Sequence, residues 1–399
     1  MDERVGRRRI LSGAGAALLL TAMQGCSPGQ LRGAGGARGA AQAAPPQLPP
    51  LHVAPDQITR ITVCTRPFRA AGPRLDVEQL GLKTVVHNYG HGGSGWSLSW
   101  GSSGIAVRKA LASGTREIAV IGCGALGLTS ATLLQRAGID VTIYAKDLPP
   151  NVRSSLATGL WSPDSRICLE ENATPAFRQL WEGMARESFE TYQTLLGLPG
   201  DPVEFIDSYA LWDRVDWDRR GSAPRDPRPP FADLADTLLG DLSPDAVDLA
   251  PGTHDFGDRH ALRFRQMMFN LGACARLLME DFLVNHGRIQ IAEFRTPADL
   301  AALPQKTLIN ATGYGARALF DDRTVIPVRG QLARMAPQSD VHYGLYYRHA
   351  AFVPRRDGAV FQYTGDSDYY GFDDATTVPS REEAELAVNT IAGLYAPAS

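Results

Sequence analysis

Three glycines with the spacing Gly122-x-Gly124-x-x-Gly127 form a pattern that can hold a dinucleotide. In such a site the first glycine permits a tight turn, and the second lets a pyrophosphate approach the backbone. The third allows the helix that follows to pack closely on the preceding strand, and the phosphate charge lies at the N-terminus of that helix. By itself the spacing is a weak signal, because a glycine-rich turn in an unrelated fold can also match it.

The segments around these glycines favour the dinucleotide interpretation. EIAVIGCG predicts a strand, ALGLTSATLLQRAG a helix and IDVTIYA a second strand, which is the context that the motif requires. An acidic residue is expected about twenty residues after the glycines, where it can bind the adenosine ribose hydroxyls. Asp147 lies there, but Lys146 directly precedes it and could instead face a phosphate. The glycines alone do not distinguish NAD from FAD.

Further segments resemble the D-amino acid oxidase family of flavoproteins. SSLATGLWSP (154–163) resembles the flavin-holding loop after the second Rossmann strand, and NATGYG (310–315) resembles the family's second nucleotide-side strand and turn. CTRPFRAAGPRL and HNYGHGGSGWSLSWG resemble its C-terminal signature almost residue for residue. The resemblance covers most of residues 53–399 and implies FAD as the cofactor. It also implies hydride transfer from the substrate Cα–H to flavin N5, hydrolysis of the imine to a 2-oxo acid and ammonia, and reoxidation by O2 to hydrogen peroxide.

The resemblance also assigns the substrate-binding side chains. Arg66 matches the arginine that pairs with the substrate carboxylate, for which a planar guanidinium is well suited, although a purely structural arginine is the alternative. Tyr347 matches one tyrosine of the carboxylate clamp, but Ala351 stands where a second, directly clamping tyrosine is expected. The tyrosines that could compensate from neighbouring positions are Tyr343, Tyr346 and Tyr363. The identity of the substrate therefore stays open.

The cofactor residues are assigned by the glycine motif and by the resemblance together. Glycines in the HNYGHGG turn let the backbone touch a flat ring, and backbone N–H groups with a helix N-terminus can stabilise negative charge on a reduced flavin. We expect His87 and His91 to be structural hydrogen-bonding residues rather than general bases. The predicted cofactor-binding residues are Gly92, Gly93, Gly95, Trp96, Ser97, Gly122, Gly124, Ala125, Leu126, Gly127, Lys146, Asp147, Ser154, Ser155, Gly159, Leu160, Trp161 and Gly313.

The predicted fold class is α/β, with an FAD-binding Rossmann-like domain and a substrate domain built on a mixed β-sheet. The FAD-binding lobe is predicted at 84–173 and 305–333. The substrate lobe is predicted at 53–83, 174–304 and 334–399. Helices are expected at 103–113, 174–195, 261–286 and 380–395, and a hairpin with RRDG as its turn at 341–365.

The order of the segments differs from the usual order in the resembled family. There the Rossmann strand comes first and the HNYGHGG signature last, whereas here residues 53–110 precede the Rossmann strand. The sequence therefore indicates a circular permutation, with the old ends joined through ALASGTRE. Permutation is tolerated where the original ends lie close and the new break falls in a loop. It predicts that the Cα atoms near Pro55 and Ala396 lie within roughly 15 Å of each other, the span of a few extended residues.

The N-terminus has the pattern of an export signal. GRRRILSGAGAALLLTAMQGC places three arginines before an apolar stretch, and the Arg-Arg-x-Ile-Leu order suits the twin-arginine route, with a basic N-terminal anchor as the alternative. Residues 1–26 are the predicted signal and 27–52 a Gly/Ala/Pro-rich linker. The protein is therefore expected to be exported, as a periplasmic protein, by the twin-arginine machinery. Attachment to the membrane is expected only through the N-terminus, and lipidation of Cys26 stays open.

The composition of the 399-residue chain is that of an ordinary globular protein, with 44% hydrophobic and 21% charged residues. A formal net charge of −3 gives no electrostatic basis for nucleic-acid binding. The five cysteines show no metal-ligand spacing, so no metal is expected. The leading hypothesis is oxidative deamination of D-amino acids, with O2 or another electron acceptor. The alternatives are oxidation of glycine, an N-methyl amino acid or another small amine, and a flavin-binding protein without turnover.

Overall fold

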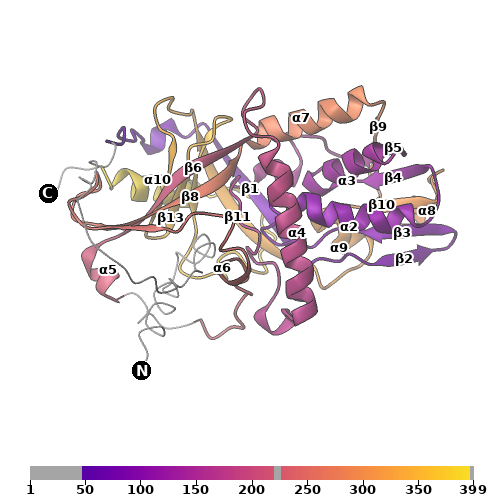
Figure 1. The fold of residues 1–399 in the computed structure, drawn as a ribbon, viewed down its shortest axis with the longest axis horizontal. Helices are drawn as coiled ribbons and strands as arrows, with labels where there is room; N and C mark the ends of the chain where they lie inside the picture. Colours follow the sequence, from indigo (N-terminus) through magenta and orange to yellow (C-terminus); the bar gives the residue numbers. More distant parts are fainter. Residues whose placement is uncertain (1–46, 220–225, 396–399) are drawn as a thin grey trace, which may run out of the picture.

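Two β-sheets with their covering helices make up the fold, and they lie side by side in Figure 1. The computed structural model describes residues 47–219 and 226–395. Both sheets contain parallel and antiparallel pairs, and the predicted α/β class is confirmed. The predicted export signal, Cys26 and most of the predicted linker lie outside the described residues, as does Ala396. No helix in the described part of the chain is long and apolar enough to cross a membrane.

The six-stranded sheet is the predicted nucleotide-binding part. Its strands, in spatial order, are β2 (Val77–Leu80), β3 (Lys83–His87), β10 (Thr307–Asn310), β4 (Glu117–Ile121), β5 (Asp140–Ala145) and β9 (Arg288–Ile291). Only β2 pairs antiparallel, and the other neighbours are parallel. The central strands are apolar on both faces, as expected where helices cover both sides of a parallel sheet.

Each face of this sheet has its own helical layer. Ile118 and Val120 of β4 belong to the core packed under α2 (Ser99–Leu111), α3 (Ala125–Arg136), α4 (Pro175–Gln193) and α7 (Leu271–Val284). Ala119 and Ile121 belong to a separate core under α8 (Pro297–Ala301) and α9 (Ala316–Leu319). The alternation of buried residues along β4 thus joins the two layers, and α2, α3 and α4 are seen packed together in Figure 1.

The eight-stranded sheet is the predicted substrate part. Its strands, in spatial order, are β1 (Arg60–Phe68), β11 (Ile326–Met335), β14 (Ala359–Tyr363), β13 (Ala350–Val353), β12 (Tyr343–Tyr347), β6 (Val203–Trp212), β8 (His260–Phe269) and β7 (Val247–Leu249). Only β12 and β6 pair in parallel. Helix α10 (Arg381–Ala392) covers one face, and its buried residues share a core with β11, β12, β13 and β14. The short helices α5 (Arg214–Arg219) and α6 (Ala235–Leu238) lie in the connection between β6 and β7.

One sequence expectation about local structure was wrong and a second was incomplete. The predicted helix at 261–286 is strand β8 followed by helix α7, because residues 260–269 pair in register with all ten residues of β6. The predicted hairpin at 341–365 is a three-stranded meander, because a tight turn at Arg348, with φ of 50°, separates β12 from β13. The RRDG turn does join β13 to β14. Helix α2 also begins four residues earlier than expected, at Ser99.

The sheets also fix which segments belong together. Strand β11 lies in the eight-stranded sheet, although its first residues fall inside the predicted FAD-binding lobe. Strands β2 and β9 lie in the six-stranded sheet, although they fall inside the predicted substrate lobe. The two described ends of the chain meet in one core that contains Leu51 and Leu394. The Tyr343 hydroxyl donates to the Pro49 carbonyl and lies 2.7 Å from the Tyr395 hydroxyl.

Candidate active site

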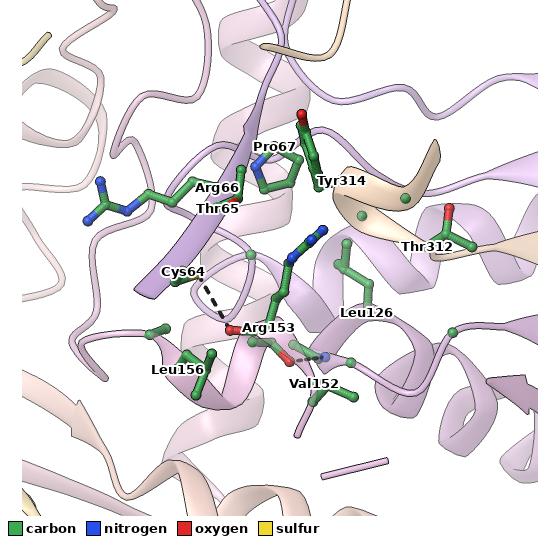
Figure 2. Close-up of a pocket in the computed structure, with 18 of the residues that line it drawn as sticks. Cys64, Thr65, Arg66, Pro67, Leu126, Val152, Arg153, Leu156, Thr312 and Tyr314 are labelled. Atoms are coloured by element: carbon green, nitrogen blue, oxygen red, sulfur yellow. Dashed lines mark hydrogen bonds between the residues drawn. The ribbon is translucent and has the colours of Figure 1, made fainter. Parts of the chain in front are cut away.

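A cavity of about 1140 Å³ lies where the two sheets meet. It is lined by the ends of β4, β5 and β10 from one sheet and by β1, β11 and β14 from the other. Part of its lining is drawn in Figure 2. A cavity that joins a nucleotide-binding edge to a second sheet can hold a long cofactor at one end and a substrate at the other.

The glycine motif closes one wall of this cavity. Gly122 has a φ of +109°, and a Cβ on it would lie 2.6 Å from the Ala311 carbonyl oxygen. A Cβ on Gly127 would lie only 2.0 Å from the Gly122 carbonyl oxygen. The strand β4 and the helix α3 therefore approach as closely as the motif predicts, and Gly127 packs this junction rather than lining the cavity. At the N-terminus of α3 the Ala125 N–H donates to Ser154 Oγ at 3.1 Å.

The HNYGHGG turn and the residues directly after it form a second wall of the cavity. Glycine stands at positions 92 and 95 for different reasons. Gly92 has a φ of +55°, and a Cβ on it would lie 2.0 Å from the Arg166 carbonyl oxygen, so tight packing against protein requires glycine there. A Cβ on Gly95 would meet no protein atom within 4 Å, although Gly95 lines the cavity. No described protein atom and no unusual φ requires glycine at 95, so the backbone there is open to a ligand in the cavity.

Polar groups next to Gly95 face the same space. The backbone N–H groups of Gly95, Trp96 and Ser97 donate to no described residue, and these residues line the cavity just before α2 begins. Ser97 Oγ accepts a hydrogen bond from the Ser162 N–H at 2.9 Å, which leaves its own O–H free to donate. The Trp96 indole N–H donates to the Ser154 carbonyl oxygen at 2.8 Å and joins this turn to the loop at 154–163. Free donors beside a helix N-terminus suit a ligand that carries negative charge.

The two histidines of the turn are both buried, but only His91 lines the cavity. His87 Nε2 lies 3.0 Å from a carboxylate oxygen of Glu78. His91 Nε2 lies 2.7 Å from Ser102 Oγ, whose O–H donates to Asn88 Oδ1 at 2.6 Å, so His91 Nε2 is the donor to Ser102. His91 Nδ1 then carries a lone pair, it has no partner among the described residues, and burial lowers the pKa of His91 to about 3.

Arg66 lies in strand β1 and lines the cavity. No described residue gives its guanidinium an ion pair or a hydrogen bond, and burial lowers its pKa from the ordinary arginine value. Figure 2 shows its side chain extending away from Tyr314, whereas Arg153 extends toward Tyr314, whose ring centroid is 5.0 Å from the Arg153 guanidinium carbon. A partly buried cation without a protein partner is suited to an anionic ligand, so Arg66 is placed to bind an anion that enters the cavity.

Tyr347 is not brought to this cavity. Its hydroxyl donates to the Asp213 carboxylate at 2.8 Å, and its ring belongs to the core under α10. The strand pairing gives the reason: Tyr346 pairs with Ala351, which pairs with Gln362, a residue that lines the cavity. Because alternate residues of a strand point to opposite faces, Tyr346 lies on the cavity face of the sheet and Tyr347 lies on the other. Tyr346 donates to Gln266 Oε1 at 3.0 Å and does not reach the lining.

The remaining tyrosine candidates also lie elsewhere. Tyr343 contacts Pro49 and Tyr395, and Tyr363 contacts Asp366, so neither lines the cavity. Ala351 is buried in β13. The structure thus places no clamping tyrosine next to Arg66 among the described residues that line the cavity.

Most of the predicted cofactor residues are brought together. Those that line the cavity are Gly92, Gly93, Gly95, Trp96, Ser97, Gly122, Gly124, Ala125, Leu126, Lys146, Asp147, Ser154, Gly159, Leu160 and Gly313. Ser155 and Trp161 do not line it. The Trp161 ring packs against Phe189, with centroids 5.2 Å apart, while the Ser155 hydroxyl is buried without a partner among the described residues. Lys146 lies 4.0 Å from both Asp147 and Glu293, so carboxylates compensate its charge at the end of β5.

Several lining residues were missed by the sequence reasoning. They are Thr158, Arg153, Glu293, Tyr314, Gly330, Gln362 and Thr364, among others. Gln362 and Thr364 stand two residues apart in VFQYT, a spacing that puts both on one face of a strand. That spacing was a readable signal, but which face meets the cavity depends on pairing with β11, far away in the sequence.

Comparisons with known proteins agree with this architecture. Residues 117–397 match the family described as DAO, FAD dependent oxidoreductase. The chain is 26% identical to a D-amino-acid oxidase of Dictyostelium discoideum over 282 residues, which are 69% of this chain and 72% of that protein. It is 28% identical to a D-amino-acid oxidase of Streptomyces coelicolor over 289 residues, which are 70% and 77% of the two chains.

Solved structures of oxidases resemble the fold at low identity. An iminodiacetate oxidase from Chelativorans sp. BNC1 superposes with a TM-score of 0.49 at 18% identity, covering 69% of this chain and 79% of that one. A glycine oxidase from Bacillus cereus superposes with a TM-score of 0.44 at 12% identity, covering 67% and 75%.

Proposed function

The chain belongs to the DAO family of FAD-dependent oxidoreductases, and on that premise we propose that it oxidises D-amino acids to 2-oxo acids, ammonia and hydrogen peroxide. The protein is an enzyme of the class that acts on amino acid C–N bonds, and its cofactor is FAD. The choice of D-amino acids as substrates is the part that we propose. It is supported by the two D-amino-acid oxidase relatives, and a carboxylate-bearing substrate is supported by Arg66, a partly buried cation without a partner among the described residues, in the cavity that the cofactor residues line.

The residues of the cavity fit FAD. Gly95 and Gly313 line it, and a Cβ on either would meet no protein atom within 4 Å, so both leave room for a flat or extended ligand. The N-terminus of α3 suits the pyrophosphate, and the free N–H groups at 95–97 suit the electron-rich edge of the flavin ring. The bound flavin supplies the electron-accepting centre for the hydride from the substrate Cα–H.

The protein's own part in this reaction is orientation. The Arg66 guanidinium can bind both oxygens of an α-carboxylate in a fork, which fixes the rotation of the amino acid about its Cα. Leu160, Leu332 and Phe269 add apolar side chains to the lining of the same cavity. Holding a substrate in a reactive geometry accounts for several kcal/mol of a barrier, on the order of 7–11 in the best cases, without any added acid or base.

Peroxide release tests the proposal together with the role of Arg66. The purified enzyme, loaded with FAD, is assayed against D-amino acids and against their L-enantiomers. We expect peroxide from D-amino acids only, and we expect Arg66→Ala to retain FAD while kcat/KM falls by 30-fold or more. An unchanged kcat/KM in Arg66→Ala would refute the role assigned to Arg66.

A second candidate function is favoured by Ala351 and by the placement of Tyr347. With no tyrosine beside Arg66, the substrate end of the cavity differs from a tyrosine-clamped site, so glycine, an N-methyl amino acid or another small amine is the alternative substrate class. Glycine and sarcosine belong in the same peroxide assay for this reason. Turnover of these amines with none of D-amino acids would replace the first proposal. Bound flavin without turnover of any amine would indicate a flavin-binding protein.

We also propose that the chain is circularly permuted. The family match begins at residue 117, yet residues 53–111 supply β1, β2, β3, the HNYGHGG turn and α2. The described ends support the idea, because Arg381 near the C-terminus donates to the Pro55 carbonyl oxygen at 2.7 Å. A reordered chain that starts at residue 116 and carries 53–115 after 395 should bind FAD and melt within a few degrees of the natural order. Failure of that chain to fold would count against the permutation.

The localisation is a further proposal that rests on the sequence alone. We propose that residues 1–26 direct export through the twin-arginine route, which carries folded proteins and suits an enzyme that acquires FAD in the cytoplasm. Replacement of Arg7 and Arg8 by lysine should leave the protein in the cytoplasm, as measured by cell fractionation. Unchanged export of this variant would rule out the twin-arginine route.

A further inference from the structure

The Arg66 guanidinium reaches across the sheet toward strand β14. Arg66 lies in β1, which pairs with β11, and β11 pairs with β14 on its other side. A Cβ on Gly330 of β11 would lie 2.5 Å from Arg66 Nη2 and 2.8 Å from Arg66 Cζ. The guanidinium therefore lies over β11 itself, in the space that the missing side chain of Gly330 leaves. Since neighbouring strands are about 4.8 Å apart, this places the cation one strand from β14.

Strand β14 and the residue just after it offer an unpaired hydroxyl in the same cavity. Thr364 is only 7% exposed and lines the cavity, and its Oγ1 is buried with no hydrogen-bond partner among the described residues. Its backbone is fixed, because the Thr364 N–H donates to the His349 carbonyl oxygen at 2.8 Å. A buried hydroxyl without a partner destabilises the protein, because it has lost its hydrogen bonds to water. A ligand that accepts its hydrogen removes that cost.

Gln362 provides a second neutral donor two residues earlier on the same face. It is 8% exposed and lines the cavity. The Thr158 hydroxyl donates to Gln362 Oε1 at 2.7 Å, which occupies the carbonyl end of the amide and leaves the Nε2 hydrogens without an acceptor among the described residues. Thr158 also lines the cavity, so the bond holds the amide at its wall.

The same pairing explains why these residues stand in for a tyrosine. Ala351 of β13 is directly opposite Gln362, and the side chains of such a pair share one face of the sheet. The small Ala351 side chain brings no hydroxyl to that face, whereas the neighbouring strand brings an amide and a hydroxyl.

We propose that Thr364 and Gln362 complete the carboxylate site of Arg66, as neutral hydrogen-bond donors that replace the phenol of a clamping tyrosine. This inference rests on the proposed function in one respect only, the binding of a carboxylate at Arg66. The site then binds a carboxylate with one cation and two neutral donors, and a neutral amide of the same shape binds it far less well. Thr364 and Gln362 act on substrate affinity, because they contact the carboxylate rather than the Cα–H that reacts.

The test is a ligand titration of the FAD-loaded enzyme, followed by the change in flavin absorbance. Benzoate is the probe, because its aromatic ring perturbs the flavin spectrum, and benzamide is the matched probe without charge. We expect Thr364→Val to weaken benzoate about tenfold while the Kd of benzamide changes less than twofold, and Thr364→Ser to restore the benzoate Kd to within twofold of the natural enzyme. Gln362→Leu is expected to weaken benzoate by a similar factor.

A matched control exists in the same sheet. Thr62 of β1 is also buried with an unpartnered hydroxyl, but it does not line the cavity. Thr62→Val should therefore leave the benzoate Kd unchanged. The inference is overturned if Thr364→Val binds benzoate within twofold of the natural enzyme, or if Thr62→Val loses as much affinity. Should Thr364→Val lose FAD, Thr364→Ala takes its place with the same expected and contrary results.

Turnover separates this inference from the proposed function. In the oxidation of a D-amino acid, Thr364→Val should raise KM about tenfold with kcat changed less than threefold. If no D-amino acid is oxidised and benzoate binding still depends on Thr364, the proposed function fails and the carboxylate site stands. If D-amino acids are oxidised and KM is unchanged in Thr364→Val, the proposed function stands and the assignment of Thr364 fails.

Discussion

Replacement of Gly330 by alanine should remove Arg66 from its working position without removing its charge. The new Cβ would lie 2.5 Å from Arg66 Nη2, 2.8 Å from Cζ and 3.3 Å from Nη1. Ordinary contact begins near 3.4 Å, so the guanidinium must move by about 0.9 Å or more. The atoms that clash are the far end of a flexible side chain, so Arg66 moves and the backbone stays.

The size of the effect follows from this displacement. A misplacement of about 1 Å in a binding or catalytic group can cost on the order of 100-fold in rate. Loss of a charge-assisted hydrogen bond costs about 1.5–3 kcal/mol, which is a factor of roughly 10–150. We therefore expect kcat/KM of Gly330→Ala to fall by 30-fold to 100-fold for a carboxylate substrate, with unchanged FAD content and a melting temperature within a few degrees.

Kinetics of peroxide release, flavin absorbance and thermal melting measure these three quantities. Gly183→Ala is the matched control, because Gly183 lies in helix α4 and a Cβ on it meets no atom within 4 Å. Natural activity in Gly330→Ala would refute the reasoning, because the guanidinium would then not need the space over β11.

Three further predictions concern His91, Gly127 and Tyr347. Burial lowers the pKa of His91 to about 3 from about 6.5, so the unfolded chain binds the extra proton and folding stability falls as the pH drops from 6.5 toward 3. In His91→Asn the free energy of unfolding, measured with urea, should fall less steeply with decreasing pH in that window, by up to about 1.4 kcal/mol per pH unit. The same slope in the variant and the natural enzyme would contradict this. Gly127→Ala brings a Cβ to 2.0 Å from a backbone oxygen and should abolish FAD retention in gel filtration, whereas a yellow variant would show that the helix can shift. Tyr347→Phe should keep kcat/KM within threefold. It should lower the free energy of unfolding by about 1 kcal/mol, because the Tyr347 hydroxyl donates a hydrogen bond to Asp213. A large loss of activity would show that Tyr347 takes part in the active site.

The cofactor end of the site could be predicted from the sequence because its residues act through the local backbone. Gly122 and Gly92 have positive φ angles and tight neighbours, and each sits in a short motif whose spacing carries the geometry. Arg66 could also be predicted through its motif, and its guanidinium has no ion pair or hydrogen bond among the described residues. Motifs of this kind need no knowledge of how distant strands pair.

The substrate end could not be predicted because it depends on the register between distant strands. Tyr346 and Tyr347 are adjacent, and only the pairing of β12 with β13 and β6 decides which one faces the cavity. Gln362 and Thr364 line the same cavity as Arg66 because β11 lies between β1 and β14. The same limit explains β8, whose ten residues form a strand through pairing with β6 rather than through a clear local pattern.

Reduction of the flavin without oxygen tests the central claim most directly. The FAD-loaded enzyme is mixed anaerobically with a D-amino acid, its L-enantiomer, glycine or sarcosine. The loss of flavin absorbance is followed at roughly 450 nm, where oxidised flavin absorbs and reduced flavin does not. The account predicts rapid bleaching by D-amino acids, no bleaching by the L-enantiomers, and much slower bleaching by D-amino acids in Arg66→Ala. A protein that bleaches equally with both enantiomers, or that stays colourless when FAD is supplied, would contradict it.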